Sequence, residues 1–158
     1  MDALARHGSK VRQRDVVGIV DFAAPSRAPR FHLVDLAAGK VDTLLVAHGK
    51  GSDPGHSGWL QKFSNVPGSE ASSSGAYLTG EEYIGKHGRS QRLIGLDPSN
   101  DLAEERAIVI HAADYVSAEV LQTQGKLGRS QGCFAVRQED LDSVLARLGE
   151  GRLIFAGR

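Results

Sequence analysis

Short apolar runs, separated by turn-forming residues, dominate the pattern of hydrophobic and polar positions along this chain. The run from Val16 to Phe22 is rich in β-branched residues and ends at a turn with two prolines, which is typical of a strand. The next apolar positions predict a hairpin with arms at 31–36 and 41–48 and a turn at 37–40. Further strands are predicted at 76–85, 91–96, 108–110, 133–136 and 152–157.

One segment near the C-terminus shows helical periodicity. Four apolar residues fall at i, i+3, i+4 and i+7, namely Leu141, Val144, Leu145 and Leu148. Acidic residues precede them and a glycine follows, so a helix is predicted over 139–148. The polar lead-in, residues 1–15, has room for a short helix at 2–7, and 102–106 predicts one helical turn. Eight or so strands and one full helix predict a mainly-β fold in a single domain of 158 residues.

The segment from Gly49 to Gly75 is dense in Gly, Ser, Pro and Asn and has no periodic apolar pattern. Long irregular segments inside compact domains are uncommon and often carry function. Glycine is abundant throughout, at 19 of 158 residues, or about 12% against a usual ~7%. Both features predict many tight turns and one long functional loop.

Composition argues against several classes of function. The 19 basic residues balance the 19 acidic ones, so no global field attracts nucleic acid or an anionic membrane surface. No apolar run approaches the ~20 residues that a transmembrane helix needs. The first ten residues lack the apolar core of a secretory leader, so we expect a mature or trimmed form of a longer gene product.

Cys133 is the only cysteine, and it follows Ser130 and Gly132 closely. A single cysteine forms no internal disulfide, and free cysteines are most often small buried hydrophobes. The residues around Cys133 favour a catalytic role instead. Gly132 lets the backbone approach a ligand, and successive N–H groups in such a turn can bind an oxyanion. The charge of Arg129 favours thiolate over thiol. We therefore interpret Cys133 as a candidate nucleophile.

His111 is the candidate base for that thiol. It ends the apolar strand at 108–110 and begins a polar segment, a place beside which pockets commonly form. A histidine after an apolar run is more often a hydrogen-bonded core residue. The pairing of His111 with Cys133 is therefore a hypothesis at this point, which two adjacent strands would satisfy.

The remaining histidines give no metal signature. His48, His56 and His87 lack the spacing of zinc ligands, among themselves and with Cys133, so no metal or other cofactor is predicted. His48 and His87 each precede a glycine at a predicted strand end. We expect these two to line the same cleft without a chemical role.

Seven segments, in this order, resemble the murein L,D-transpeptidase catalytic-domain family of the YkuD-like fold: VAHGKGS, FSNVPGSEASSSGAYLTG, YIGKHG, RLIGLDPSND, ERAIVIHAADYVS, GKLGRSQGC and LIFA. The resemblance extends from about Val17 to Phe155, nearly the whole chain. It implies a single catalytic domain over residues 1–158, with β-sandwich or barrel-like sheets and one C-terminal helix. It also implies a cysteine enzyme that acts on peptidoglycan stem peptides without a cofactor.

The resemblance implies roles for individual residues. The nucleophile falls on Cys133 and the general base on His111, with a backbone carbonyl near Ala112 orienting the imidazole. Ser130 and Gly132 match the motif around the nucleophile, and the amides of Gly132 and Cys133 are expected to bind the oxyanion. Substrate contacts fall on Arg129, Arg106, Tyr83 and His87.

Two features depart from the family pattern. Many members carry an arginine two positions after the cysteine, where this chain has Ala135, and Arg129 or Arg106 is expected to replace it. Sequences closest in this motif read Trp-Gly-Cys-Pro-Ala, whereas this chain reads Gln-Gly-Cys-Phe-Ala from Gln131. The loss of tryptophan removes an aromatic wall and is expected to alter substrate choice.

The implied reaction is acyl transfer. Cys133 would form a thioester with the third stem residue, release D-alanine and pass the acyl group to an amine, which gives a 3-3 cross-link. Hydrolysis of the same thioester would make the protein an L,D-carboxypeptidase, and the two departures leave open a non-catalytic murein-binding module. Because peptidoglycan lies outside the cytoplasm, the resemblance implies the periplasm or the cell wall.

Overall fold

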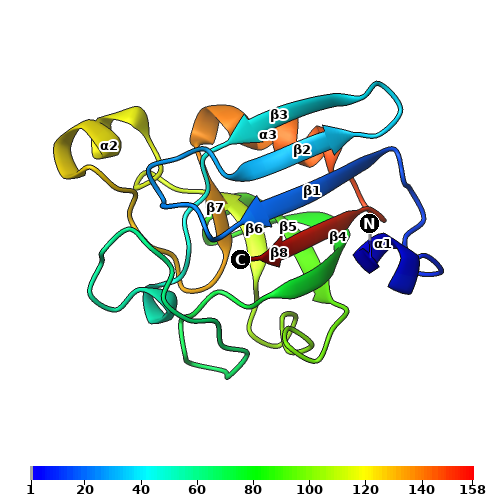
Figure 1. Ribbon diagram of the computed structural model, residues 1–158, viewed down its shortest axis with the longest axis horizontal. Helices are drawn as coiled ribbons and strands as arrows, with labels where there is room; N and C mark the ends of the chain where they lie inside the picture. Colours follow the sequence, from blue (N-terminus) through cyan, green and yellow to red (C-terminus); the bar gives the residue numbers. More distant parts are fainter. Residues whose placement is uncertain (1) are drawn as a thin grey trace.

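A computed structural model describes residues 2–158, and Met1 lies outside the described residues. Eight strands form one sheet in the order β3-β2-β1-β8-β4-β5-β6-β7 (Figure 1). This arrangement confirms the mainly-β prediction. In chain order the elements are α1 (Asp2–Arg6), β1 (Val16–Asp21), β2 (Phe31–Asp35), β3 (Lys40–Leu44), the 3₁₀ helix η1 (Lys50–Ser52), β4 (Gly75–Gly85), β5 (Gly88–Gly95), β6 (Val109–Ala112), α2 (Ala118–Gln124), β7 (Phe134–Val136), α3 (Gln138–Arg147) and β8 (Leu153–Gly157).

The sheet curves until its two edges nearly meet. The chain leaves β3 and passes beside β7, where the Ala47 N–H donates to the Ala135 carbonyl at 2.9 Å. A second bridge joins Gly49 to Ser130, just before β7. The result is a barrel-like sheet, which places the start of the long loop against the segment that carries Cys133.

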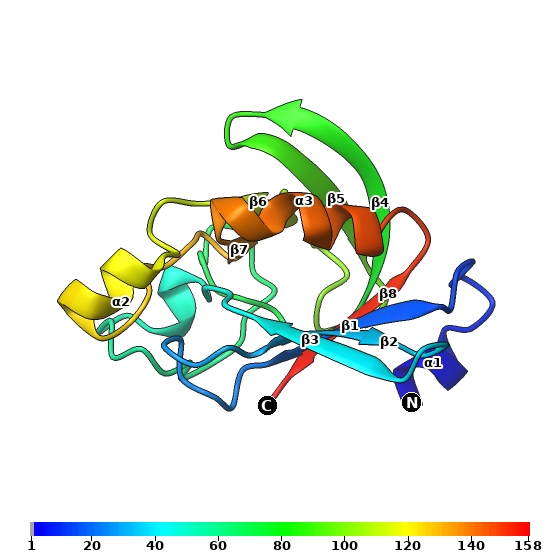
Figure 2. The same cartoon turned by 90° about the horizontal axis from the view of Figure 1, so that it is seen from above.

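The core lies inside this curve, against α3. Figure 2 shows α3 between the arm formed by β1–β3 and the arm formed by the β4–β5 hairpin. Its apolar face is buried, as the helical periodicity predicted. Strand β1 alternates in the same way, with Val16 and Val20 buried and Ile19 exposed. The main core cluster includes Phe31, Leu33, Tyr77, Ile110, Phe134, Leu141, Val144 and Leu145.

Two elements differ from the sequence-based prediction. The second hairpin arm was expected to extend to residue 48, but β3 ends at Leu44. Beyond that point the Val46 carbonyl accepts from the buried Arg30 side chain and Ala47 pairs with β7, so the chain changes neighbours. Helix α2 was not predicted, and none of its residues is buried.

Candidate active site

The loop before β7 is a tight turn fixed by Ser130. The Ser130 hydroxyl donates to the Cys133 carbonyl at 2.7 Å and accepts the Gly132 N–H at 3.1 Å. Gly132 has a φ of 110°, and a Cβ there would lie 2.6 Å from the Ala71 carbonyl oxygen. Only glycine fits this turn without strain. The Ser130 N–H in turn donates to the His48 carbonyl at 3.0 Å, which ties the turn to the opposite edge of the sheet.

The Cys133 side chain is half-buried, and the thiol forms no disulfide. Its Sγ accepts the Val109 N–H and donates to the Ala107 carbonyl, both at 3.4 Å. Burial raises the pKa of the thiol, while the Val109 N–H and the charges of Lys86 and Arg106 act against that rise. The sequence suggested that Arg129 would favour the thiolate, and the structure gives that effect to Lys86 and Arg106.

His111 is buried on β6. The neighbouring strand, β7, begins one residue after Cys133. The His111 Nδ1 lies 2.9 Å from the Ala112 carbonyl oxygen. A carbonyl only accepts, so Nδ1 carries the proton and Nε2 keeps its lone pair. Burial lowers the pKa of His111, the Ala112 hydrogen bond opposes this, and the charges of His87 and Lys86 lower the pKa further. The imidazole is therefore neutral at neutral pH, as a general base must be.

Parallel pairing of β6 with β7 brings the two candidates together. His111 is in register with Ala135. Cys133 lies in the turn that leads directly into β7, two residues before Ala135. Both side chains line one cavity of about 630 Å³. The other expected contacts that line it are Tyr83, His87, Arg106, Arg129 and Ser130.

The two arginines of this cavity are engaged with the long loop. Arg106 donates to the carbonyls of Ser64 at 3.0 Å and Ala71 at 2.6 Å. Arg129 donates to the carbonyls of Asp53 at 2.6 Å and Pro54 at 3.2 Å. These contacts hold the segment between Gly49 and Gly75 over the site.

Sequence reasoning missed several residues of the cavity. Lys50 and Lys86 are exposed cations on its rim. Tyr115 also lines it, and burial raises the pKa of its hydroxyl to about 12, so the phenol stays protonated. Lys86 stood beside His87 in a segment that had already been singled out. Lys50 and Tyr115 gave no signal in the sequence, because only the fold brings them to the cavity.

His48 lies inside a buried network rather than in the cavity. Its Nε2 lies 3.0 Å from Asp53 Oδ2, and its Nδ1 accepts from Arg30 at 3.0 Å. Burial is the main reason that the pKa of His48 falls to about 4. Hydrogen bonds from Ser57, Gly58 and His48 overcome the effect of burial on Asp53 and lower its pKa to about 2. The expectation that His48 lines the cleft is thus not met, because its ring is hydrogen-bonded between Arg30 and Asp53 in the interior.

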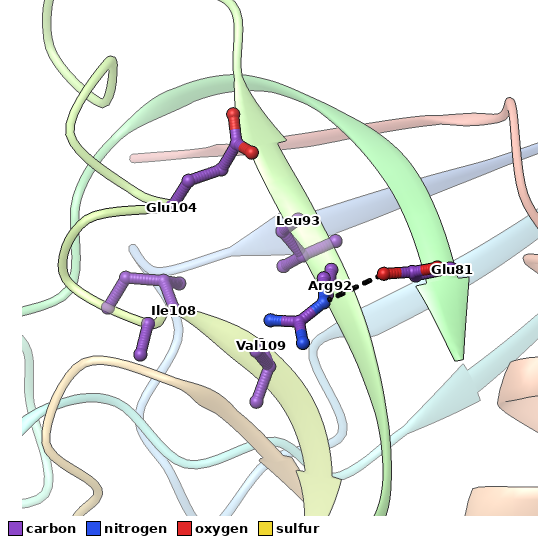
Figure 3. A pocket seen from close by; sticks show the side chains of 7 residues that line it. Glu81, Arg92, Leu93, Glu104, Ile108 and Val109 are labelled. Carbon is purple, nitrogen blue, oxygen red and sulfur yellow. Dashed lines mark hydrogen bonds and ion pairs between the residues drawn. The ribbon is translucent and has the colours of Figure 1, made fainter. Parts of the chain in front are cut away.

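A second cavity, of about 360 Å³, lies beside the segment that contacts the sulfur. Ala107 and Val109 line both cavities. Figure 3 shows the Arg92 side chain directed at Glu81, with Glu104 on the other side of the cavity. Arg92 Nε and Glu81 Oε1 are 3.2 Å apart. The space opens where the register of β4 against β5 shifts between Thr79 and Glu82.

Within residues 2–158, no group of three or more His, Cys, Asp and Glu side chains is arranged to hold a metal ion. The helices of this same range are all too short or too polar to cross a membrane.

Comparison with known proteins gives one family and a set of similar folds. The sequence profile of the L,D-transpeptidase catalytic domain matches residues 1–156. No curated protein sequence matches the chain. Among solved structures, an L,D-transpeptidase from Mycobacterium smegmatis aligns over 91% of this chain at 12% identity, with a TM-score of 0.53.

Two further solved structures show the same fold. L,D-transpeptidase 3 from Mycobacterium tuberculosis, in complex with a faropenem-derived adduct, aligns over 91% of this chain at 11% identity, with a TM-score of 0.54. The helical cell shape determining protein Pgp2 from Campylobacter jejuni aligns over 98% at 14% identity, also with a TM-score of 0.54. This chain corresponds to 53% to 60% of the length of these three proteins.

Proposed function

Because the chain belongs to the L,D-transpeptidase catalytic domain family, we propose that it is a cysteine acyltransferase that acts on peptidoglycan tetrapeptide stems. The observation that supports this most directly is the opening of Cys133 and His111, from neighbouring parallel segments, into one cavity. The site of action is then the periplasm or the cell wall, where peptidoglycan lies.

The first step transfers the acyl group to sulfur. His111 Nε2 takes the thiol proton, and Sγ attacks the carbonyl carbon of the third stem residue. The C–N bond to D-alanine then breaks, and the imidazolium returns the proton to the leaving amine. Burial disfavours both the free thiolate and the free imidazolium, so we expect the proton transfer to accompany the attack on the carbonyl.

The amide of Cys133 is the donor we assign to the oxyanion. The Gly132 N–H is engaged by the Ser130 hydroxyl at 3.1 Å, so its part is to shape the turn. For the Cys133 N–H, no acceptor is found among residues 2–158. A donor of this kind typically contributes about 3–4 kcal/mol to the transition state.

The basic side chains that line the cavity outnumber its two carboxylates, Glu70 and Glu105, which suits an anionic stem peptide. Arg106 and Arg129 already hold backbone carbonyls, so Lys50 and Lys86 are the cations assigned to substrate carboxylates. Tyr83 and His87, from the β4–β5 hairpin, contribute the facing wall.

The second step passes the acyl group to an amine. We assign the approach of the amine to the second cavity, which shares Ala107 and Val109 with the cavity of Cys133. The Val109 N–H and the Ala107 carbonyl are the groups that contact Sγ. Glu81 is paired with Arg92, which leaves Glu104 as the carboxylate for an incoming ammonium group. His111 would then accept a proton from the amine as it attacks, and the free thiol of Cys133 is restored.

The experiment is incubation with purified disaccharide-tetrapeptide, followed by mass analysis of protein and products. A thioester on Cys133 and a 3-3 cross-linked dimer are expected, and both are absent in Cys133→Ala and His111→Ala. Glu104→Gln is expected to lower cross-linking relative to hydrolysis, with Glu119→Gln on α2 as the matched control. Tripeptide without dimer from the wild type would identify an L,D-carboxypeptidase instead.

A carbapenem provides an independent probe of the nucleophile. A covalent adduct on Cys133 is expected from the wild type and not from Cys133→Ala. If the wild type sediments with murein but forms neither the adduct nor the thioester, the enzymatic proposal is wrong and the chain is a binding module.

A further inference from the structure

His87 lies with Lys86 in the turn between β4 and β5. The pair Gly85–Gly88 closes the hairpin, and Gly88 has the left-handed conformation, with a φ of 81°. The hairpin arches away from the other strands (Figure 2), and its turn lies on the rim of the larger cavity. His87 is exposed in this turn, whereas His111, on β6, is buried.

The two imidazoles form a near-parallel stack. Their centroids are 4.1 Å apart and their planes differ by 11°. His111 is thereby constrained twice, since Nδ1 is bonded to the Ala112 carbonyl and one ring face is covered by His87. Within residues 2–158, Nε2 makes no hydrogen bond that competes with a proton donor in the cavity.

We propose that His87 is a positioning residue, whose stacked ring holds the imidazole of His111 in the plane from which Nε2 serves Cys133. The inference rests on the proposed function as far as the substrate is concerned. Its test does not, because the reactivity of any thiol–imidazole pair depends on the plane of the base. The inference changes the role expected of His87, from substrate contact to support of the base.

The effect of the charge of His87 on His111 has to be separated from the effect of the His87 ring on the plane of the His111 imidazole. The titratable side chains that share the cavity with His111 are Lys86, His87 and Tyr83 from the hairpin, Tyr115 from the segment after β6, Cys133 and Arg129 from the turn before β7, Lys50, Glu70, Glu105 and Arg106. His87→Phe keeps a flat ring and removes the titratable group. His87→Ala removes both.

The measurement is alkylation of Cys133 by iodoacetamide at neutral pH, which reports the thiolate that His111 generates. His87→Ala is expected to slow alkylation by about two- to tenfold, the range that loss of one ring stack gives. His87→Phe is expected to stay within about twofold of the wild type, because the stack is retained. His32→Ala, a histidine on β2 bonded to Thr43 at 2.9 Å and outside the cavity, is the matched control and is expected to be silent.

Two results would overturn the inference. One is an alkylation rate for His87→Ala equal to that of the wild type. The other is a rate for His87→Phe as low as that for His87→Ala, because a retained stack would then be insufficient. Thermal unfolding of each variant checks folding, which an exposed turn residue should barely affect. Alkylation that follows the stack in a protein without activity on tetrapeptide would refute the proposed function and leave this inference standing.

Discussion

Acid should destabilise this protein through His48, well before its carboxylates are protonated. The imidazole is 1% exposed, and burial, with the charge of Arg30, lowers its pKa from 6.5 to about 4. Between these values the unfolded chain binds a proton at His48 that the folded chain does not. The free energy of unfolding therefore falls as the pH falls from 6.5 to about 4.

The size of this effect follows from the two pKa values. At 1.36 kcal/mol per pH unit, the range from 6.5 to about 4 corresponds to about 3 kcal/mol. Asp53 contributes in a lower window, since its pKa is lowered to about 2 and its stabilisation is lost only as the pH falls from about 4 towards that value. A loss of about 3 kcal/mol is large against the 5–15 kcal/mol typical of a folded domain.

The assay is urea denaturation at pH 7.5, 6.5, 5.5 and 4.5 for the wild type and His48→Gln. Glutamine can offer a donor and an acceptor but does not titrate, so the pH slope should flatten even if the variant is less stable throughout. A residual slope is expected from His111, whose pKa burial also lowers. His32→Gln serves as the control. Equal slopes in the wild type and His48→Gln would refute the reasoning, whatever their absolute stabilities.

Two further predictions concern the turn and the hairpin. Gly132→Ala forces an L side chain to a φ of 110° and into contact with a carbonyl of the long loop, so we expect a loss of about 2–5 kcal/mol and a much slower carbapenem reaction. Gly55→Ala, which has open space around its Cβ, should match the wild type in both measurements. Lys86→Gln removes a charge that lowers the pKa of Cys133, so the pH profile of alkylation should move to higher pH. An unmoved profile, identical to that of the control Lys62→Gln, would contradict this electrostatic role.

The elements with a periodic apolar face could be predicted from the sequence. Helix α3 and most of the strands bury one face, and burial is what produces such a pattern. Helix α2 has no buried residue, so it left no pattern to detect. Its local signals are the Ser117 hydroxyl, which caps the Val120 N–H, Glu119 in the first turn, and Gly125, which ends the helix with a φ of 71°.

The candidate site was predicted by residue type, but not its construction. Cys133 and His111 carry recognisable chemistry, whereas their proximity depends on the parallel pairing of two short strands. Strand β7 has three residues, and its outer edge is completed by the Ala47 N–H from a distant segment. No local pattern encodes such a contact, because register between strands is a property of the folded sheet.

The replacement of the expected arginine by Ala135 illustrates this limit. Ala135 is fully buried and packs with Leu45, Ala47, Val116 and Leu127, so a guanidinium could not occupy that position in this sheet. Arg106 and Arg129 were the natural substitutes by charge, yet both donate to carbonyls of the long loop. Their hydrogen bonds hold that loop against the turn that carries Cys133. The freely exposed cations on the rim are lysines, and a lysine presents a point charge rather than a bidentate fork. Recognition of a stem carboxylate here should therefore tolerate shifts in carboxylate position better than an arginine fork would. Substrates with displaced carboxylates, compared in the tetrapeptide assay, would test that difference.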